Sequence, residues 1–224
     1  MLFALGEPVA FIALVLSFLL ALVLRAVAIR VSARSLGLVH GNESISPRLR
    51  EDVDPFGAVA AAIGGMGWGK TISVDEIPRF RGRGRAAAVF LSGPLVTIVA
   101  AQFFFVAYAL TTTQNVLSFL SPSDLLRGLS LPVTDQVLLS FGAGLLTFGL
   151  LALIPIPPLD GFGVMWSAVR RPGAGLQWMR LWFEEKNIGV LLLLVFCFFP
   201  LARPILLLIL DVLGLLFIRL WGNV

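Results

Sequence analysis

The stretch Leu153–Gly161, with the sequence Leu-Ile-Pro-Ile-Pro-Pro-Leu-Asp-Gly, closes an apolar run that begins at Val137. Its prolines end a helix, because proline lacks the backbone N–H that a helix interior uses. Asp160 is therefore left as a single acid at the end of a hydrophobic segment. A carboxylate at membrane depth is energetically costly and usually functional, so this acid is the first candidate for a site.

The composition is that of an integral membrane protein. Hydrophobic residues make up 58% of the 224 residues, charged residues only 13%, and the mean hydropathy is +0.95. The net charge of +4 comes from basic residues that flank apolar spans, which favours membrane lipids over nucleic acid as partners. The single cysteine, Cys197, excludes an internal disulfide.

Residues 1–224 are predicted to form one membrane domain. A membrane-spanning helix needs about 20 apolar residues, and the last apolar block, Ile188–Leu220, exceeds this length. Pro200 and Pro204 divide that block into two helices or bend one helix sharply. The predicted spans are residues 9–34, 86–110, 137–154, 188–200 and 204–220.

The basic residues are distributed unevenly among the loops. Most lie between Arg25 and Arg85, whereas residues 111–136 contain only Arg127. Cytoplasmic loops are enriched in Lys and Arg, so we expect loop 35–85 to be cytoplasmic and the N-terminus to lie outside, most simply in a bacterial inner membrane. Within that loop, residues 64–74 are too rich in glycine for a spanning helix, and they are predicted to form a short interfacial strand or re-entrant segment.

Four motifs follow one another along the chain: Asp54–Gly57 (Asp-Pro-Phe-Gly), Gly67–Lys70 (Gly-Trp-Gly-Lys), Ser92–Leu95 (Ser-Gly-Pro-Leu) and the proline-rich Pro155–Gly161. In this order and approximate spacing they resemble the site-2 protease (M50) family of intramembrane zinc metallopeptidases. The resemblance covers most of the chain up to Gly161. It implies an all-α membrane protein, a polytopic helical bundle built on the site-2 protease core.

The same resemblance implies a zinc site that this chain does not complete. The family carries His-Glu-x-x-His on one helix, with two histidines on one helix face and a glutamate that activates water, and a distant aspartate completes the ligand set. Both histidines and the glutamate are missing here, so the chain is expected to be a degenerate member without catalytic residues, metal or other cofactor. The degenerate positions are Arg25, Ala26 and Ile29 on that helix, Ala152 and Thr97 in place of two asparagines, and the retained Asp160.

Asp160 still needs a partner, because an unpaired buried carboxylate is costly. Arg25 stands at the first histidine position, so its guanidinium is predicted to take the place of the cation and pair with Asp160. The alternative is that Arg25 extends toward the headgroups while Asp160 caps the helix that starts near Gly161. A substitute metal site made of His40, Glu43 and Asp160 is a further, weaker possibility, because His40 lies in a turn-like loop.

Four tryptophans near the predicted membrane interfaces are expected to act as anchors there: Trp166, Trp178, Trp182 and Trp221. We expect the protein to be a catalytically inactive, site-2-protease-like structural or accessory subunit that binds other transmembrane proteins in a complex. Two alternatives remain open at this point. One is an atypical active intramembrane metalloprotease, and the other is a small transporter or channel component.

Overall fold

The computed structural model describes residues 1–38, 45–112, 115–198 and 204–222. Within these ranges the protein is helical and has no strand, which confirms the predicted all-α bundle; one isolated antiparallel bridge joins Val53 to Gly69. The helices are η1 (Leu2–Ala4), α1 (Pro8–Ser35), α2 (Leu49–Asp52), α3 (Pro55–Gly64), η2 (Arg79–Arg81), α4 (Arg83–Thr111), α5 (Pro122–Leu126), α6 (Val133–Ala152), α7 (Asp160–Ala168), α8 (Ala174–Met179), the π-helical η3 (Arg180–Glu185), α9 (Ile188–Phe198) and α10 (Ile205–Arg219).

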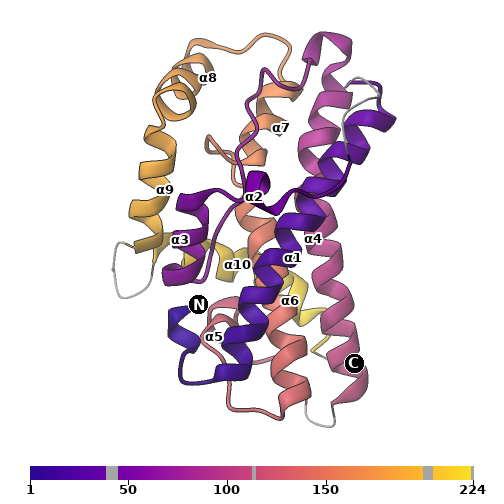
Figure 1. The fold of residues 1–224 in the computed structure, drawn as a ribbon, viewed down its shortest axis with the longest axis vertical. Helices are drawn as coiled ribbons and strands as arrows, with labels where there is room; N and C mark the ends of the chain where they lie inside the picture. The colour runs from indigo at the N-terminus through magenta and orange to yellow at the C-terminus, as the bar shows by residue number, and fades with distance from the viewer. Residues whose placement is uncertain (39–44, 113–114, 199–203, 223–224) are drawn as a thin grey trace.

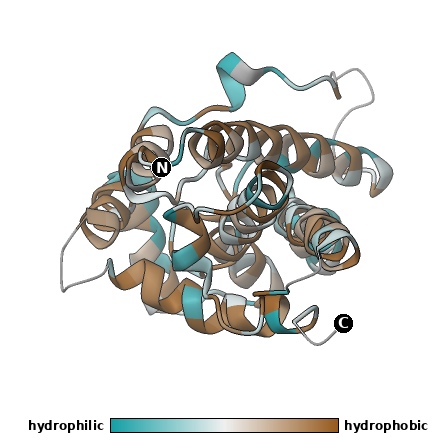
Figure 2. Cartoon of the chain, turned by 90° about the horizontal axis from the view of Figure 1, so that it is seen from below, coloured by the Kyte–Doolittle hydropathy of each residue, from teal (hydrophilic) through white to brown (hydrophobic). Residues whose placement is uncertain are grey.

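Three helices, α1, α4 and α6, are long and apolar enough to cross a membrane, and they run side by side along the long axis of the molecule (Figure 1). The most apolar window of α6 is 72% buried, against 44% for α1 and for α4, so α6 is the central helix. Hydrophobic residues cover most of the helices (Figure 2). On α4 they include Phe103, which is 70% exposed. An apolar outer surface of this kind suits lipid, and the chain is a membrane protein.

Small residues let the three long helices approach closely. Gly142 of α6 lies against Phe105 of α4, and Gly149 of α6 lies against Thr97. Gly144 of α6 packs in the same way on Ser17 of α1. Helices in lipid associate through close van der Waals packing rather than through the hydrophobic effect, so these contacts at small residues fix the bundle.

Each predicted span coincides in position with a helix whose described ends lie within four residues of the predicted limits. In the described residues α9 and α10 have 11 and 15 residues, shorter than a membrane span needs, so these two stay predicted spans. The last apolar block forms two helices, α9 and α10, and residues 199–203 between them lie outside the described ranges. Pro204 precedes α10 directly, as expected for a proline at a helix start.

The glycine-rich segment forms a re-entrant hairpin rather than a strand within the described residues. Asp54 caps the start of α3 by accepting a hydrogen bond from Gly57 N–H, and Gly65 ends the helix with a positive φ of 76°. The chain then returns in extended form, with Trp68 against α3 and with Gly67 and Gly69 against the middle of α1. The sequence prediction of a short strand is therefore wrong; the segment follows helix α3 and returns beside it, and its re-entry into a membrane stays a prediction.

Candidate functional site

The centre of the candidate site is a buried ion pair between Arg25 on α1 and Asp160 at the start of α7. The guanidinium donates from Nε to Oδ2 at 2.6 Å and from Nη2 to Oδ1 at 2.5 Å. The side chains are only 8% and 2% exposed. The two N–H groups thus bind the two carboxylate oxygens side by side, the geometry that makes arginine–carboxylate pairs strong and directional. The structure therefore brings together the two residues that the sequence predicted to pair.

Glycines leave the room that this pair needs. A Cβ atom at Gly93 of α4 would lie 2.7 Å from Cγ of Arg25, so a larger residue there would displace the arginine. A Cβ atom at Gly161 would lie 2.1 Å from the carbonyl oxygen of Leu153. Only glycine lets the proline-rich turn fold back tightly enough to place Asp160 beside α1.

The re-entrant segment supplies a third partner. Nη1 of Arg25 donates to the carbonyl oxygen of Lys70 at 2.9 Å. Arg25 is therefore held by α7 and by the return arm of the hairpin, and it connects both to α1. Asp160 is the first residue of α7, where the positive end of the helix dipole also favours its negative charge. The alternative, in which Arg25 extends toward the headgroups, does not match its contacts with Asp160 and Lys70.

The other degenerate positions surround the pair. Ile29 and Arg25 both face Gly93 of α4, as residues four apart on one helix face should. Ala26 lies on the adjacent face and is buried. Ala152 ends α6 close to Asp160 and lines a small cavity with it. Thr97 is about one turn beyond Gly93 along α4 and donates within its own helix to the carbonyl oxygen of Pro94 at 2.8 Å.

These side chains do not fit a zinc ion. Zinc in proteins is held by thiolate, imidazole and carboxylate groups, and of the positions that the family uses for metal binding only Asp160 supplies such a group. Both of its oxygens face a guanidinium, which carries the positive charge that a metal would carry. Within the described ranges no three His, Cys, Asp or Glu residues come together as possible metal ligands. His40 and Glu43, which the sequence analysis considered as substitutes, lie outside the described residues.

A second ion pair that the sequence analysis missed lies about one and a half turns further along α1. Arg30 forms a bidentate pair with Asp52 at the end of α2, and Asp52 also accepts from Arg48 N–H at 2.8 Å. Asp52 is 8% exposed as a residue. Its carbonyl oxygen accepts from Lys70 N–H at 2.8 Å, so this pair closes the base of the re-entrant hairpin.

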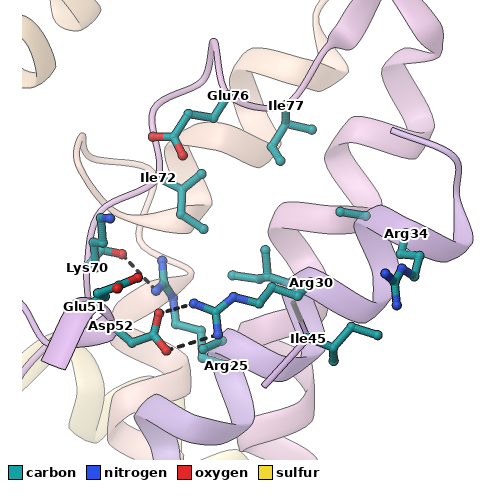
Figure 3. Close-up of a pocket in the computed structure, with 13 residues that line it drawn as sticks. Arg25, Arg30, Arg34, Ile45, Glu51, Asp52, Lys70, Ile72, Glu76 and Ile77 are labelled. Carbon is teal, nitrogen blue, oxygen red and sulfur yellow. Dashed lines mark hydrogen bonds and ion pairs between the residues drawn. The ribbon is translucent and has the colours of Figure 1, made fainter. Parts of the chain in front are cut away.

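Both arginines border a cavity of about 370 Å³, which we call the α1 cavity. Figure 3 shows Arg30 pointing to Asp52 and Arg25 reaching the carbonyl of Lys70, while Ile72 and Ile77 form the opposite wall. The cavity is large enough for a small ligand. Its lining mixes charged and apolar side chains.

A second, much smaller cavity of about 10 Å³ lies on the other side of Arg25, and we call it the inner cavity. Its wall includes Arg25, Asp160, Ala152 and Trp68. Arg25 is thus common to both cavities and separates the α1 cavity from the interior of the bundle.

The four predicted interface tryptophans lie in different environments. Trp178 and Trp182 are 55% and 37% exposed and pack on each other, with Lys186 over the ring of Trp182. Trp221 donates to the side chain of Gln102 at 3.0 Å. Trp166 is only 6% exposed, with two arginine side chains near its ring. Trp166 therefore packs inside the protein, and its role as an interface anchor stays a prediction.

Comparison with known proteins gives a distant relative. No family model matches the chain, and no solved structure matches it. A protein of Bacillus subtilis (strain 168) with the description "Putative zinc metalloprotease YwhC" is 26% identical over 156 residues. The match covers 69% of this chain and 64% of that protein, so the chain spans less than two thirds of the relative's length. This distant similarity is consistent with the resemblance to the M50-like membrane metalloproteases.

Proposed function

We propose that this protein is a catalytically inactive member of the site-2 protease family that acts as a structural or accessory subunit of a membrane protein complex. The observation that carries the proposal is the bidentate Arg25–Asp160 pair. It occupies the retained acid with a guanidinium, and the helix that would supply two histidines and a glutamate carries Arg25, Ala26 and Ile29 instead. The scaffold motifs persist while the reactive groups are replaced.

The orientation in the membrane is part of the same proposal and rests on the distribution of basic residues. The basic residues of α1, Arg30 and Arg34, and those of residues 79–85 belong on the cytoplasmic side of a bacterial inner membrane, with the N-terminus outside. The apolar outer surfaces of the helices then face lipid or the transmembrane helices of partner proteins. No reaction step is assigned to the chain, because none of its described residues near Asp160 can activate water in the way that the family's glutamate does.

A second candidate is an atypical active intramembrane metalloprotease, which the printed description of the Bacillus relative favours. Zinc analysis of the full chain, purified in mild detergent after equilibration with zinc, separates the two. We expect no zinc to remain after gel filtration. If the unmodified chain retains one zinc ion and Asp160→Asn loses it, the proposal of an inactive protein is overturned and the protease is supported.

The accessory role needs its own test. We expect native mass spectrometry of the assembly, extracted from the membrane that contains it, to show a stoichiometric integral membrane partner. The Arg25→Met/Asp160→Asn double variant removes both charges, and so any chemistry at the site, but keeps side chains of similar size. It should retain the partner. A chain that is extracted alone at all protein concentrations would contradict the accessory role, whatever its zinc content.

A further inference from the structure

The indole of Trp68 is buried without a partner for its N–H. Trp68 lies on the return arm of the re-entrant hairpin and is 3% exposed. No described residue accepts a hydrogen bond from its Nε1. Buried polar groups in folded proteins are nearly always hydrogen-bonded, and tryptophan placed in a core usually finds an acceptor. The missing acceptor therefore points to a ligand at this position.

The inner cavity has the size and the lining for one water molecule. Its volume of about 10 Å³ is close to the roughly 10–15 Å³ that a single water needs by this measure, and it is far too small for an organic ligand. Trp68 lines it together with Asp160 and Arg25, while Phe148 and Ala152 contribute apolar surface. A cation is disfavoured by the guanidinium, and an anion is disfavoured by the carboxylate.

Asp160 can accept a further hydrogen bond. Each of its oxygens accepts one bond from Arg25, and an ionised carboxylate has about four lone-pair sites. We infer that one water molecule is bound in the inner cavity, where it accepts a hydrogen bond from Trp68 Nε1–H and donates one to the carboxylate of Asp160. The water thereby satisfies the two polar groups that the protein leaves incompletely bonded.

This water would connect the return arm of the hairpin to the start of α7. Arg25 already bonds both elements, through the carbonyl of Lys70 and the carboxylate of Asp160. The bridge from Trp68 to Asp160 closes these contacts into a ring. The inference depends on the contacts of Trp68, Asp160 and Arg25, and it does not need a partner protein.

Indole NMR of the full chain in detergent micelles or nanodiscs tests the inference. The chain has five tryptophans, and Trp68→Phe identifies the Trp68 signal by its loss. We expect the Trp68 N–H proton to show a cross-peak to a water of long residence and to have a hydrogen-bonded chemical shift. Trp221, whose indole donates to Gln102 at 3.0 Å, gives the reference shift for a hydrogen-bonded indole.

Ala152→Ser is the variant that locates the water. Its hydroxyl group would enter the inner cavity, replace the water and accept from the indole, so the cross-peak should disappear while the Trp68 proton keeps its hydrogen-bonded shift. Absence of the cross-peak in the unmodified chain would overturn the inference. Persistence of the cross-peak in folded Ala152→Ser would place the water outside the inner cavity and would overturn it equally.

Discussion

Replacing Asp160 by asparagine should destabilise the protein strongly, because it leaves a buried guanidinium without its counter-charge. The substitution preserves the shape of the side chain. It removes one acceptor oxygen and places an amide N–H₂ group against an N–H of Arg25, so one of the two bonds becomes a contact between donors. Arg25 keeps its bond to the carbonyl of Lys70 and one bond to the remaining amide oxygen. It loses the third bond and the negative charge of Asp160.

The expected magnitude follows from the burial of the pair. Removing one partner of a buried ion pair costs about 3–5 kcal/mol, because the remaining charge is uncompensated. With side chains 8% and 2% exposed, Arg25–Asp160 belongs to that class. The exposed pair Arg48–Glu51, with side chains 54% and 58% exposed, is the matched control. For Glu51→Gln we expect a change of about 0–1 kcal/mol.

The assay is reversible unfolding in mixed micelles, followed by tryptophan fluorescence, for the unmodified chain, Asp160→Asn, Arg25→Met and the double variant. Replacing both charges should cost less than the sum of the two single changes, because neither charge is then left alone. The reasoning fails if Asp160→Asn lowers the free energy of unfolding by no more than Glu51→Gln does. It fails equally if the two single changes are additive in the double variant.

Two further substitutions test the site from other directions. Arg25→His, Ala26→Glu and Ile29→His in one chain should create zinc binding that survives gel filtration, measured by atomic emission, since two imidazoles then join the buried acid; if the folded variant remains without zinc, the proposed equivalence to the family's metal helix is wrong. Gly93→Ala should destabilise by about 1–3 kcal/mol in thermal unfolding, because its methyl group would overlap the arginine. Gly84→Ala, on the same helix and with open space around it, should be neutral or slightly stabilising, and equal effects at the two glycines would refute the packing argument.

The ion pair could be predicted from the sequence because two independent constraints coincided. Asp160 ends an apolar run and needs a partner, and the resemblance to the site-2 protease family, anchored on Ala33 and Leu36-Gly37, placed Arg25 at the first histidine position. The first constraint comes from hydropathy and the second from the family resemblance. The structure satisfies both with a direct bidentate contact.

Other features depend on contacts that sequence patterns do not specify. Helix α3 was missed even though Asp54-Pro55 is a good start signal, with a capping acid followed by proline at the first helical position. The glycines that follow it are typical of a loop and obscure this signal. The Arg30–Asp52 pair joins residues 22 positions apart, and Trp166 packs in a cluster with the distant Val74, with arginines from two other segments near its ring. Neither arrangement follows from local periodicity.

Under the proposed function, the Arg25–Asp160 pair takes over the structural role that the metal has in the site-2 protease family. In the arrangement that the family resemblance implies, zinc ties the histidine helix to the acid. Without zinc, Asp160 would be a buried charge that pushes α1 and α7 apart or takes up a proton. A guanidinium at position 25 removes this problem and adds a bond to Lys70 on the hairpin, which holds three segments together. Under that proposal the absence of the histidines and the presence of Arg25 are physically linked, because an apolar residue at position 25 would leave the buried acid without a cation. The retained acid then has a structural explanation that requires no catalytic activity.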